Sequence, residues 1–88
     1  MKVEFLAKFN KDLDKIYLAH VKHAVAKAIV EVEAAQNIQQ VGNVKKLKGT
    51  KTAYRIRIGD YRIGFYYERG IVQFARVVHR KDIYKVFP

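Results

Sequence analysis

Three arginines alternate with apolar residues in the segment YRIRIGDYRIGFYY, residues 54–67. A Gly-Asp pair separates its two alternating stretches, which is typical of a β-hairpin with a two-residue turn. With that turn, Arg57 faces Arg62 and Arg55 faces Gly64. Like charges at directly opposed positions destabilise a sheet, and a bound polyanion would relieve the repulsion. Because the guanidinium group is a planar fork of donors, the pattern indicates phosphate binding.

The apolar positions of the hairpin alternate with the arginines, so helices are expected to cover the apolar face and leave the arginines on an open face. Gly64 opposite Arg55 would leave bare backbone there that a ligand can approach closely. Tyr66 falls on the same face and could stack a nucleobase. The loop before the hairpin extends the cationic surface around Leu47, which we interpret as an anchor into the core; its lysines are Lys45, Lys46, Lys48 and Lys51.

The positive charge is concentrated in one half of the chain. The net charge is +10; residues 1–43 hold six Lys and five Asp/Glu (+1), and residues 44–88 hold twelve Lys/Arg and three Asp/Glu (+9). A charge that served solubility alone would be spread evenly. The asymmetry favours an anionic partner, most often a nucleic acid, although an acidic protein or a membrane surface would use the same field.

The elements that must position these residues follow the order β-α-α-β-β-β. KVEFLAKF (2–9) alternates as a first strand, and a short helix would follow with Asn10 as N-cap and Asp12 and Asp14 in its first turns. Apolar residues at three- and four-residue steps predict a longer helix over 17–36. We therefore predict an α+β fold in which two N-terminal helices pack on one face of a small antiparallel sheet.

Some residues invite other readings. His20 and His23 lie at i and i+3 of the long helix, but a metal pair needs further ligands, so we read them as solvated and predict no metal site. Arg76 falls on the apolar side by strict alternation, so either a bulge redirects it or it reaches the edge of the sheet. Tyr17 and two tyrosines of the hairpin, Tyr61 and Tyr67, are interpreted as aromatic residues of the core or of the sheet edge.

Length and composition bound the remaining possibilities. The 88 residues suffice for one domain, residues 1–88, with a single core. The chain has no cysteine, which excludes disulfides and thiolate metal sites and agrees with a cytosolic, cytoplasmic protein. No apolar run approaches the length of a membrane span, and the N-terminus lacks the apolar segment of a signal peptide.

Three motifs in this order and spacing resemble the RelE/ParE superfamily of bacterial and archaeal toxins: VKKLKG, YRIRIGDYRIGFYY and RVVHRKDIY. The resemblance covers nearly the whole chain, and the HRKDIY ending is closer to the RelE branch. It implies a toxin of a type II toxin–antitoxin system that cuts mRNA on the ribosome. In that reaction a 2′-hydroxyl attacks the adjacent phosphate without metal or other cofactor. The resemblance also implies an acidic cognate antitoxin, encoded by a neighbouring gene, that covers the basic surface.

The resemblance also assigns roles to individual residues. Arg62 matches an arginine that stabilises the phosphorane-like charge, and Arg80 matches one assigned to leaving-group protonation or charge stabilisation. Tyr84 matches an aromatic that stacks on the nucleotide. Arg55 and Arg57 fall where the best-studied branch has two lysines, one of them a candidate base.

Arginine is a poor base because its guanidinium group stays protonated far above neutral pH. Arg55 and Arg57 are therefore expected to hold phosphate, and His79 is the remaining residue with a near-neutral pKa, available as acid or base. Two other functions remain open: a ParE-like inhibitor of DNA gyrase, and a non-catalytic RNA-binding member of the family.

Overall fold

The chain folds into five strands and three α-helices, and the computed structural model describes all of residues 1–88. The strands are β1 (Lys2–Phe5), β2 (Val44–Lys46), β3 (Ala53–Ile58), β4 (Tyr61–Glu68) and β5 (Ile71–His79). The helices are α1 (Ala7–Lys15), α2 (Ala19–Ala34) and α3 (Ile83–Val86), with a 3-10 turn at Ile38–Gln40. None of the three α-helices combines the length and the hydropathy that a membrane span requires.

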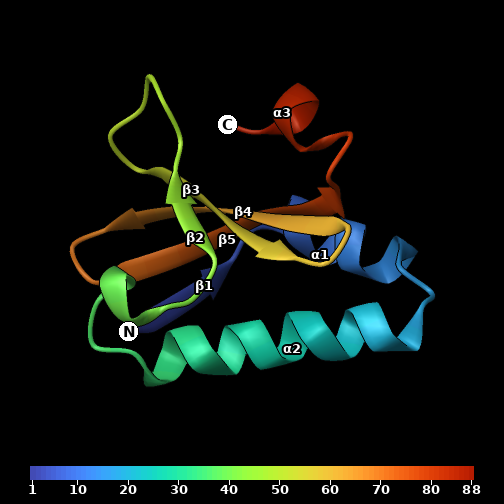
Figure 1. Cartoon of the computed structure of the whole chain (residues 1–88), viewed down its shortest axis with the longest axis horizontal. Helices are drawn as coiled ribbons and strands as arrows, with labels where there is room; N and C mark the ends of the chain where they lie inside the picture. Colours follow the sequence, from blue (N-terminus) through green and yellow to red (C-terminus); the bar gives the residue numbers. More distant parts are fainter.

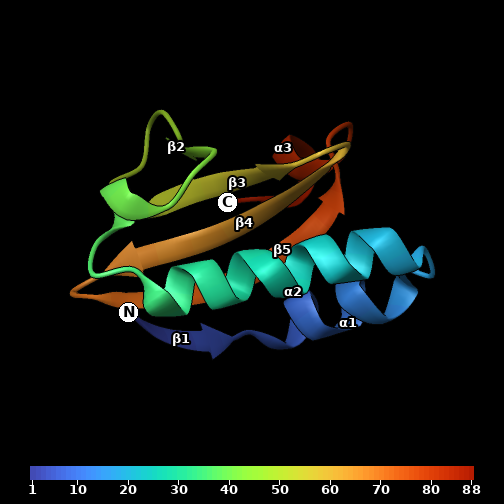
Figure 2. The same cartoon turned by 60° about the horizontal axis from the view of Figure 1, so that its bottom comes forward.

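The strands form one mixed sheet in the order β1-β5-β4-β3-β2. Helices α1 and α2 lie against one face of this sheet, and α3 lies on the other side (Figures 1 and 2). The predicted α+β class with two helices on one face is confirmed. The prediction of an antiparallel sheet is wrong at one edge, because β1 pairs in parallel with β5, with Lys2 opposite Ile71. Parallel neighbours need a long crossover, and the two helices begin that connection.

The main core lies between the helices and the sheet. Its sheet side comes from alternate residues of β3 and β4, and its helix side from the apolar stripe of α2 at three- and four-residue steps. The members from these elements are Val21, Val25, Ala28, Val32, Ile56, Ile63 and Phe65. The apolar face predicted for the hairpin is therefore the face that the helices bury.

Helix α1 differs from the sequence prediction in the residue at which it begins and in the role of Asp12. It begins at Ala7, with Leu6 as a cap that makes no side-chain hydrogen bond, so Asn10 lies inside the helix and is not its N-cap. Phe9 explains the earlier start: it is completely buried, with its ring centroid 5.5 Å from that of Phe74. The first strand accordingly stops at Phe5 and does not reach residue 9.

Asp12 is the one buried charged residue, with 6% of its surface exposed. Arg76 donates to both of its carboxylate oxygens, at 2.7 and 3.0 Å, and the backbone N–H of Val77 donates a third hydrogen bond at 3.1 Å. The hydrogen bond to Asp12 raises the pKa of Arg76, and burial opposes it. Gly64 pairs with Arg76 and Phe65 with Phe74, so β5 has a bulge at Ala75. The bulge redirects Arg76, which takes the position opposite Gly64 and binds Asp12.

A second apolar cluster lies on the face away from α1 and α2. Its members are Leu47, Ala53, Ala75, Ile83 and Phe87. The burial of Leu47 confirms its predicted role as the anchor of the lysine loop. The cluster also brings the C-terminal segment back over the sheet, so the face that the sequence left open is partly covered.

Gly64 is the position where this cover is tightest. A Cβ atom at Gly64 would lie 2.6 Å from the ring of Phe87, so only glycine leaves room for that ring. The expectation that Gly64 exposes bare backbone to a ligand is wrong, because Phe87, 3% exposed, occupies the space. Alternation along a strand shows which face a residue is on, but not which distant segment returns to cover it.

Candidate functional site

The hairpin places its arginines as the sequence predicts. Strands β3 and β4 pair with Ile58 opposite Tyr61, Arg57 opposite Arg62 and Arg55 opposite Gly64. Gly59 takes a φ of 60°, a left-handed conformation that glycine adopts without strain, and with Asp60 it forms the tight turn. The two arginines at opposed positions are therefore held together by strand register.

Arg62 is at the centre of a cationic group that we call the arginine cluster: Arg55, Arg57, Arg62 and Arg80. Its guanidinium donates to the carbonyl oxygens of Gly59 and Tyr61, at 2.8 and 2.9 Å, which fixes it beside the turn. Burial lowers the pKa of Arg62, and the charges of Arg55, Arg57 and then Arg80 lower it further. The other three arginines therefore all lie close enough to Arg62 to affect its pKa.

The other arginines of the cluster are held from different elements. Arg55 donates to the carbonyl oxygen of Asn43 at 3.1 Å, while its Nε atom is buried with no protein partner. The backbone N–H of Arg80 donates to the carbonyl oxygen of Asp60 at 2.7 Å, and its Nε lies 3.8 Å from the Asp60 carboxylate. Arg80 is the only one of the four in an ion pair, so the cluster keeps a large uncompensated positive charge.

Tyr84 lies beside this cluster on α3. It lies close enough to Arg62 to oppose the lowering of the Arg62 pKa. Its side chain is 64% exposed, whereas its neighbour Ile83 is completely buried. The buried Ile83 and Phe87 fasten α3 to the sheet and leave the ring of Tyr84 free toward solvent.

His79 is placed apart from the arginines. It pairs with Tyr61 on the helix side of the sheet, and the two rings make an edge contact with centroids 5.7 Å apart. Both line a cavity of about 350 Å³ between the first turns of α2 and the β3–β4 turn, together with Leu18 and His20. The Nδ1 atom of His79 accepts a hydrogen bond from the backbone of Lys81. The structure therefore does not bring His79 together with Arg62.

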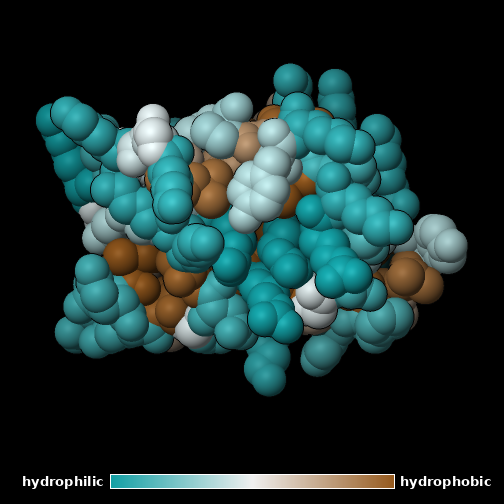
Figure 3. All heavy atoms as spheres, turned by 45° about the horizontal axis from the view of Figure 1, so that its top comes forward, coloured by the Kyte–Doolittle hydropathy of each residue, from teal (hydrophilic) through white to brown (hydrophobic).

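The lysines and Tyr66 lie around the second apolar cluster. Lys45, Lys46 and Lys48 line a cavity with Tyr84, while Lys51 is exposed in the same loop and does not line it. Tyr66 is half-buried against Phe87, with ring centroids 5.1 Å apart. The surface on this side is mainly hydrophilic, with apolar patches between the polar side chains (Figure 3).

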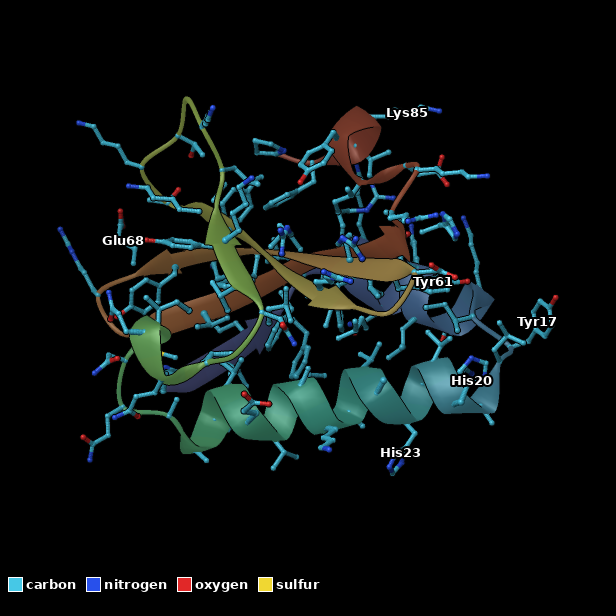
Figure 4. The ribbon with its side chains drawn as sticks, in the orientation of Figure 1. Tyr17, His20, His23, Tyr61, Glu68 and Lys85 are labelled. Atoms are coloured by element: carbon cyan, nitrogen blue, oxygen red, sulfur yellow. The ribbon has the colours of Figure 1, made fainter.

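The other aromatic and histidine residues that the sequence analysis singled out lie outside the arginine cluster. Tyr17, read from the sequence as a core or edge aromatic, is 88% exposed and projects beyond the end of α2 (Figure 4). That reading is wrong because Tyr17 falls in the connection between α1 and α2, after the helical stripe has ended. His23 is exposed and points away from the sheet (Figure 4), and no group of three or more His, Cys, Asp or Glu side chains converges anywhere.

Comparison with known proteins gives a consistent picture. Residues 3–84 match the family model described as ParE toxin of type II toxin-antitoxin system, parDE. The chain is 38% identical to Toxin RelE3 of Methanocaldococcus jannaschii over 89 residues, which cover the whole of both chains.

Solved structures agree with this match. The toxin of a RelB–RelE complex from Methanococcus jannaschii is 35% identical, with a TM-score of 0.82 over 97% of this chain and 99% of that one. A chain of the RelBE2 toxin–antitoxin complex from Mycobacterium tuberculosis shares the fold at 22% identity, with a TM-score of 0.72 over 90% of this chain and 96% of that one.

Proposed function

The chain belongs to the RelE/ParE superfamily of type II toxin–antitoxin toxins, on its RelE-like branch, and from this premise we propose that it is a ribosome-dependent endoribonuclease that cleaves mRNA. The observation that carries the proposal is the arginine cluster beside Tyr84. A group of uncompensated guanidinium donors next to an exposed aromatic ring fits a single-stranded RNA backbone and one of its bases.

In the proposed reaction the 2′-hydroxyl of one nucleotide attacks the adjacent phosphorus. The bond from phosphorus to the 5′-oxygen breaks, which gives a 2′,3′-cyclic phosphate and a 5′-hydroxyl end. Arg62 binds the phosphate oxygens as negative charge develops on them. Arg80 stabilises or protonates the leaving oxygen, and Tyr84 stacks on a base to orient the strand.

Arg55 and Arg57 hold phosphate in this proposal and do not serve as bases. Arginine is already protonated at neutral pH and cannot accept a second proton, and the one nearby imidazole, that of His79, lies on the opposite face of the sheet. The attacking hydroxyl therefore loses its proton to solvent. A positioned base contributes about 10²–10⁴ in rate, so the enzyme depends mainly on preorganised positive charge.

We further propose that an acidic cognate antitoxin binds the basic surface. The support is the similarity to the toxin of the Methanococcus jannaschii complex, which was solved with RelB. The net charge of +9 on residues 44–88 supplies the complementary field.

Primer extension on translated mRNA after brief induction tests the nuclease proposal. We expect cuts at positions linked to codons in cells that express the wild-type chain, and none with Arg62→Ala. Growth arrest with intact transcripts would contradict the proposal.

The match to a ParE model supports one second candidate, a toxin that inhibits DNA gyrase without cleaving RNA. A supercoiling assay with the purified protein separates the two candidates. Inhibition of supercoiling with intact mRNA would favour the gyrase inhibitor, while a wild-type chain that binds RNA and does neither would be a non-catalytic RNA-binding member of the family.

A further inference from the structure

The tight turn between β3 and β4 holds two arginines of the cluster at once. The carbonyl oxygen of Gly59 accepts a hydrogen bond from the Arg62 side chain at 2.8 Å. The carbonyl oxygen of Asp60 accepts one from the backbone N–H of Arg80 at 2.7 Å, and the Asp60 carboxylate lies 3.8 Å from Nε of the same arginine. The turn and the end of β5 meet beside Tyr61 (Figure 4). Two consecutive residues thus anchor arginines that come from different strands.

The two arginines are anchored through different parts of the guanidinium group. Arg62 uses its Nη1 atom, which donates to the carbonyl oxygens of Gly59 and Tyr61, so its Nε and Nη2 donors remain free. Arg80 faces Asp60 with Nε, so its two terminal nitrogens remain free. Two parallel N–H groups along one edge of a guanidinium fit two oxygens of a phosphate. Each arginine therefore keeps one edge for an anion while another part of the group is tied to the turn.

Asp60 is an unexpected residue beside a site for an anion. It is the only acidic side chain in an ion pair with the arginine cluster, and its charge repels phosphate. Stability does not explain the pair, because 58% of the Arg80 side chain and 72% of that of Asp60 are exposed, and exposed pairs stabilise a fold very little. The turn does not require it either, since a Gly-Asn pair forms the same kind of hairpin turn. The carboxylate therefore needs an explanation within the site.

We propose that Asp60 is a positioning residue for Arg80. Its carboxylate restrains the long Arg80 side chain at Nε and keeps the two terminal nitrogens turned toward the phosphate that Arg62 binds. An unrestrained arginine would have to lose its rotamer freedom when the transition state forms, whereas a restrained one has already lost much of it. The disadvantage is weaker binding of RNA before cleavage. This role rests on the nuclease function proposed above, because it concerns the leaving oxygen assigned to Arg80.

The first test compares cleavage with binding in Asp60→Asn, which removes the charge but keeps the backbone contact and the turn. We expect single-turnover cleavage of translated mRNA at saturating toxin to slow by about tenfold, since a misplaced group can reduce the rate by up to about 10². An RNA hexamer that 2′-deoxy sugars protect from cleavage should bind about twofold more tightly at low salt, because a repulsive charge is gone. A merely structural residue would not move the two quantities in opposite directions.

Asp82→Asn is the matched control. Asp82 follows Arg80 closely in the sequence and is 54% exposed, but it pairs with Lys85, which points outward from α3 (Figure 4). The variant removes the same charge from the same region, so we expect binding to tighten by at most about twofold and cleavage to keep the wild-type rate. Thermal melting shows that each variant is folded. A wild-type cleavage rate for Asp60→Asn at saturation, or an equal loss in the two variants, would overturn the proposal.

A double variant shows whether Asp60 acts through Arg80. In the Arg80→Ala background, Asp60→Asn should have no further effect on the cleavage rate, because the group that it positions is absent. Losses that multiply in the double variant would mean that Asp60 acts on another group, and would overturn the proposal.

Side-chain dynamics separate this role from the nuclease function. The heteronuclear NOE of the Arg80 Nε–H group reports how restrained the side chain is in the free protein, without RNA. We expect a restrained group in the wild type and in Asp82→Asn, and a mobile one in Asp60→Asn. Equal mobility in all three would overturn the positioning role even if the protein cleaves mRNA. The expected pattern in a chain that leaves translated mRNA intact would support the positioning role and contradict the nuclease function.

Discussion

The two faces of the hairpin formed by β3 and β4 use the same strands for opposite purposes. On the helix side, Ile63 and Phe65 are completely buried and belong to the main core. On the other side, Arg62, which is next to Ile63 in β4, is paired directly across the ladder with Arg57 of β3. The first face gains stability from burial, and the second loses some through repulsion. The difference teaches that one strand register places core residues on one face and brings like charges together on the other.

The largest effect is expected on the helix side. Phe65→Ala removes a completely buried ring that packs on Tyr54 and Phe74, with centroids 5.5 and 6.2 Å away. We expect the free energy of unfolding to fall by about 3–5 kcal/mol, because transfer and cavity terms add. Urea denaturation measures it; a loss below about 1 kcal/mol would show that the two faces do not differ as described.

Arg62→Ala should separate activity from stability. We expect cleavage of translated mRNA to slow by about 10²–10³, the usual cost of losing one preorganised donor to a developing negative charge. Unfolding should stay within about 0.5 kcal/mol of wild type. Single-turnover cleavage measures the first quantity and urea denaturation the second. A variant that cleaves at the wild-type rate would remove Arg62 from the mechanism.

Gly64→Ala tests whether the cationic face depends on the cover above it. The added Cβ meets the rigid ring of Phe87 at 2.6 Å, so the ring and the segment that carries Tyr84 have to move. We expect a loss of about 1–3 kcal/mol in unfolding free energy, as for other overpacked sites, and weaker cleavage. Phe87→Leu in the same chain should restore part of the stability, and an additive loss in the double variant would show that the two positions do not interact.

The smallest expected effect is a gain in the free energy of unfolding. Arg57→Gln removes one partner of the opposed arginine pair, so we expect the free energy of unfolding to rise by about 0.2–1 kcal/mol at low ionic strength. The gain should shrink between about 0.01 M and about 1 M salt, because the Debye length falls from about 30 Å to about 3 Å. Denaturation at the two salt concentrations measures it. Destabilisation at low salt would mean that Arg57 stabilises the fold.

Local sequence patterns were enough to predict much of the fold. The two-residue turn fixed the register of β3 and β4, and period-two alternation then assigned every arginine of the hairpin to the correct face. Contacts between distant segments were not predictable in this way. The parallel partner of β1 and the return of Phe87 over Gly64 depend on where chains meet in space, and neither has a local pattern.

The site was predicted in the same uneven way. The hairpin arginines followed from register, whereas His79 was grouped with Arg62 and lies on the other face. The face on which His79 lies follows from its pairing with Tyr61. The sequence does not show this pairing, because the bulge at Ala75 shifts the alternation of side chains along β5. The cavity that Lys45, Lys46 and Lys48 line with Tyr84 was not predicted, although its lysines were identified. The available sign was the i, i+4 spacing of Ile83 and Phe87, which indicates a short helix with one buried side.

The parallel pairing of β1 with β5 also has a consequence for folding during translation. Glu4 and Gln73, which share a hydrogen bond across that pair, are 69 positions apart. A contact between residues this far apart in the sequence forms late in folding, because the conformational entropy of the intervening chain must be lost first. Translation at about 5–20 residues per second leaves the first strand without its neighbour for roughly 3–14 s. During that interval the nascent chain lacks the pairing that completes the edge of its sheet, so the native fold cannot form until most of the polypeptide has been made.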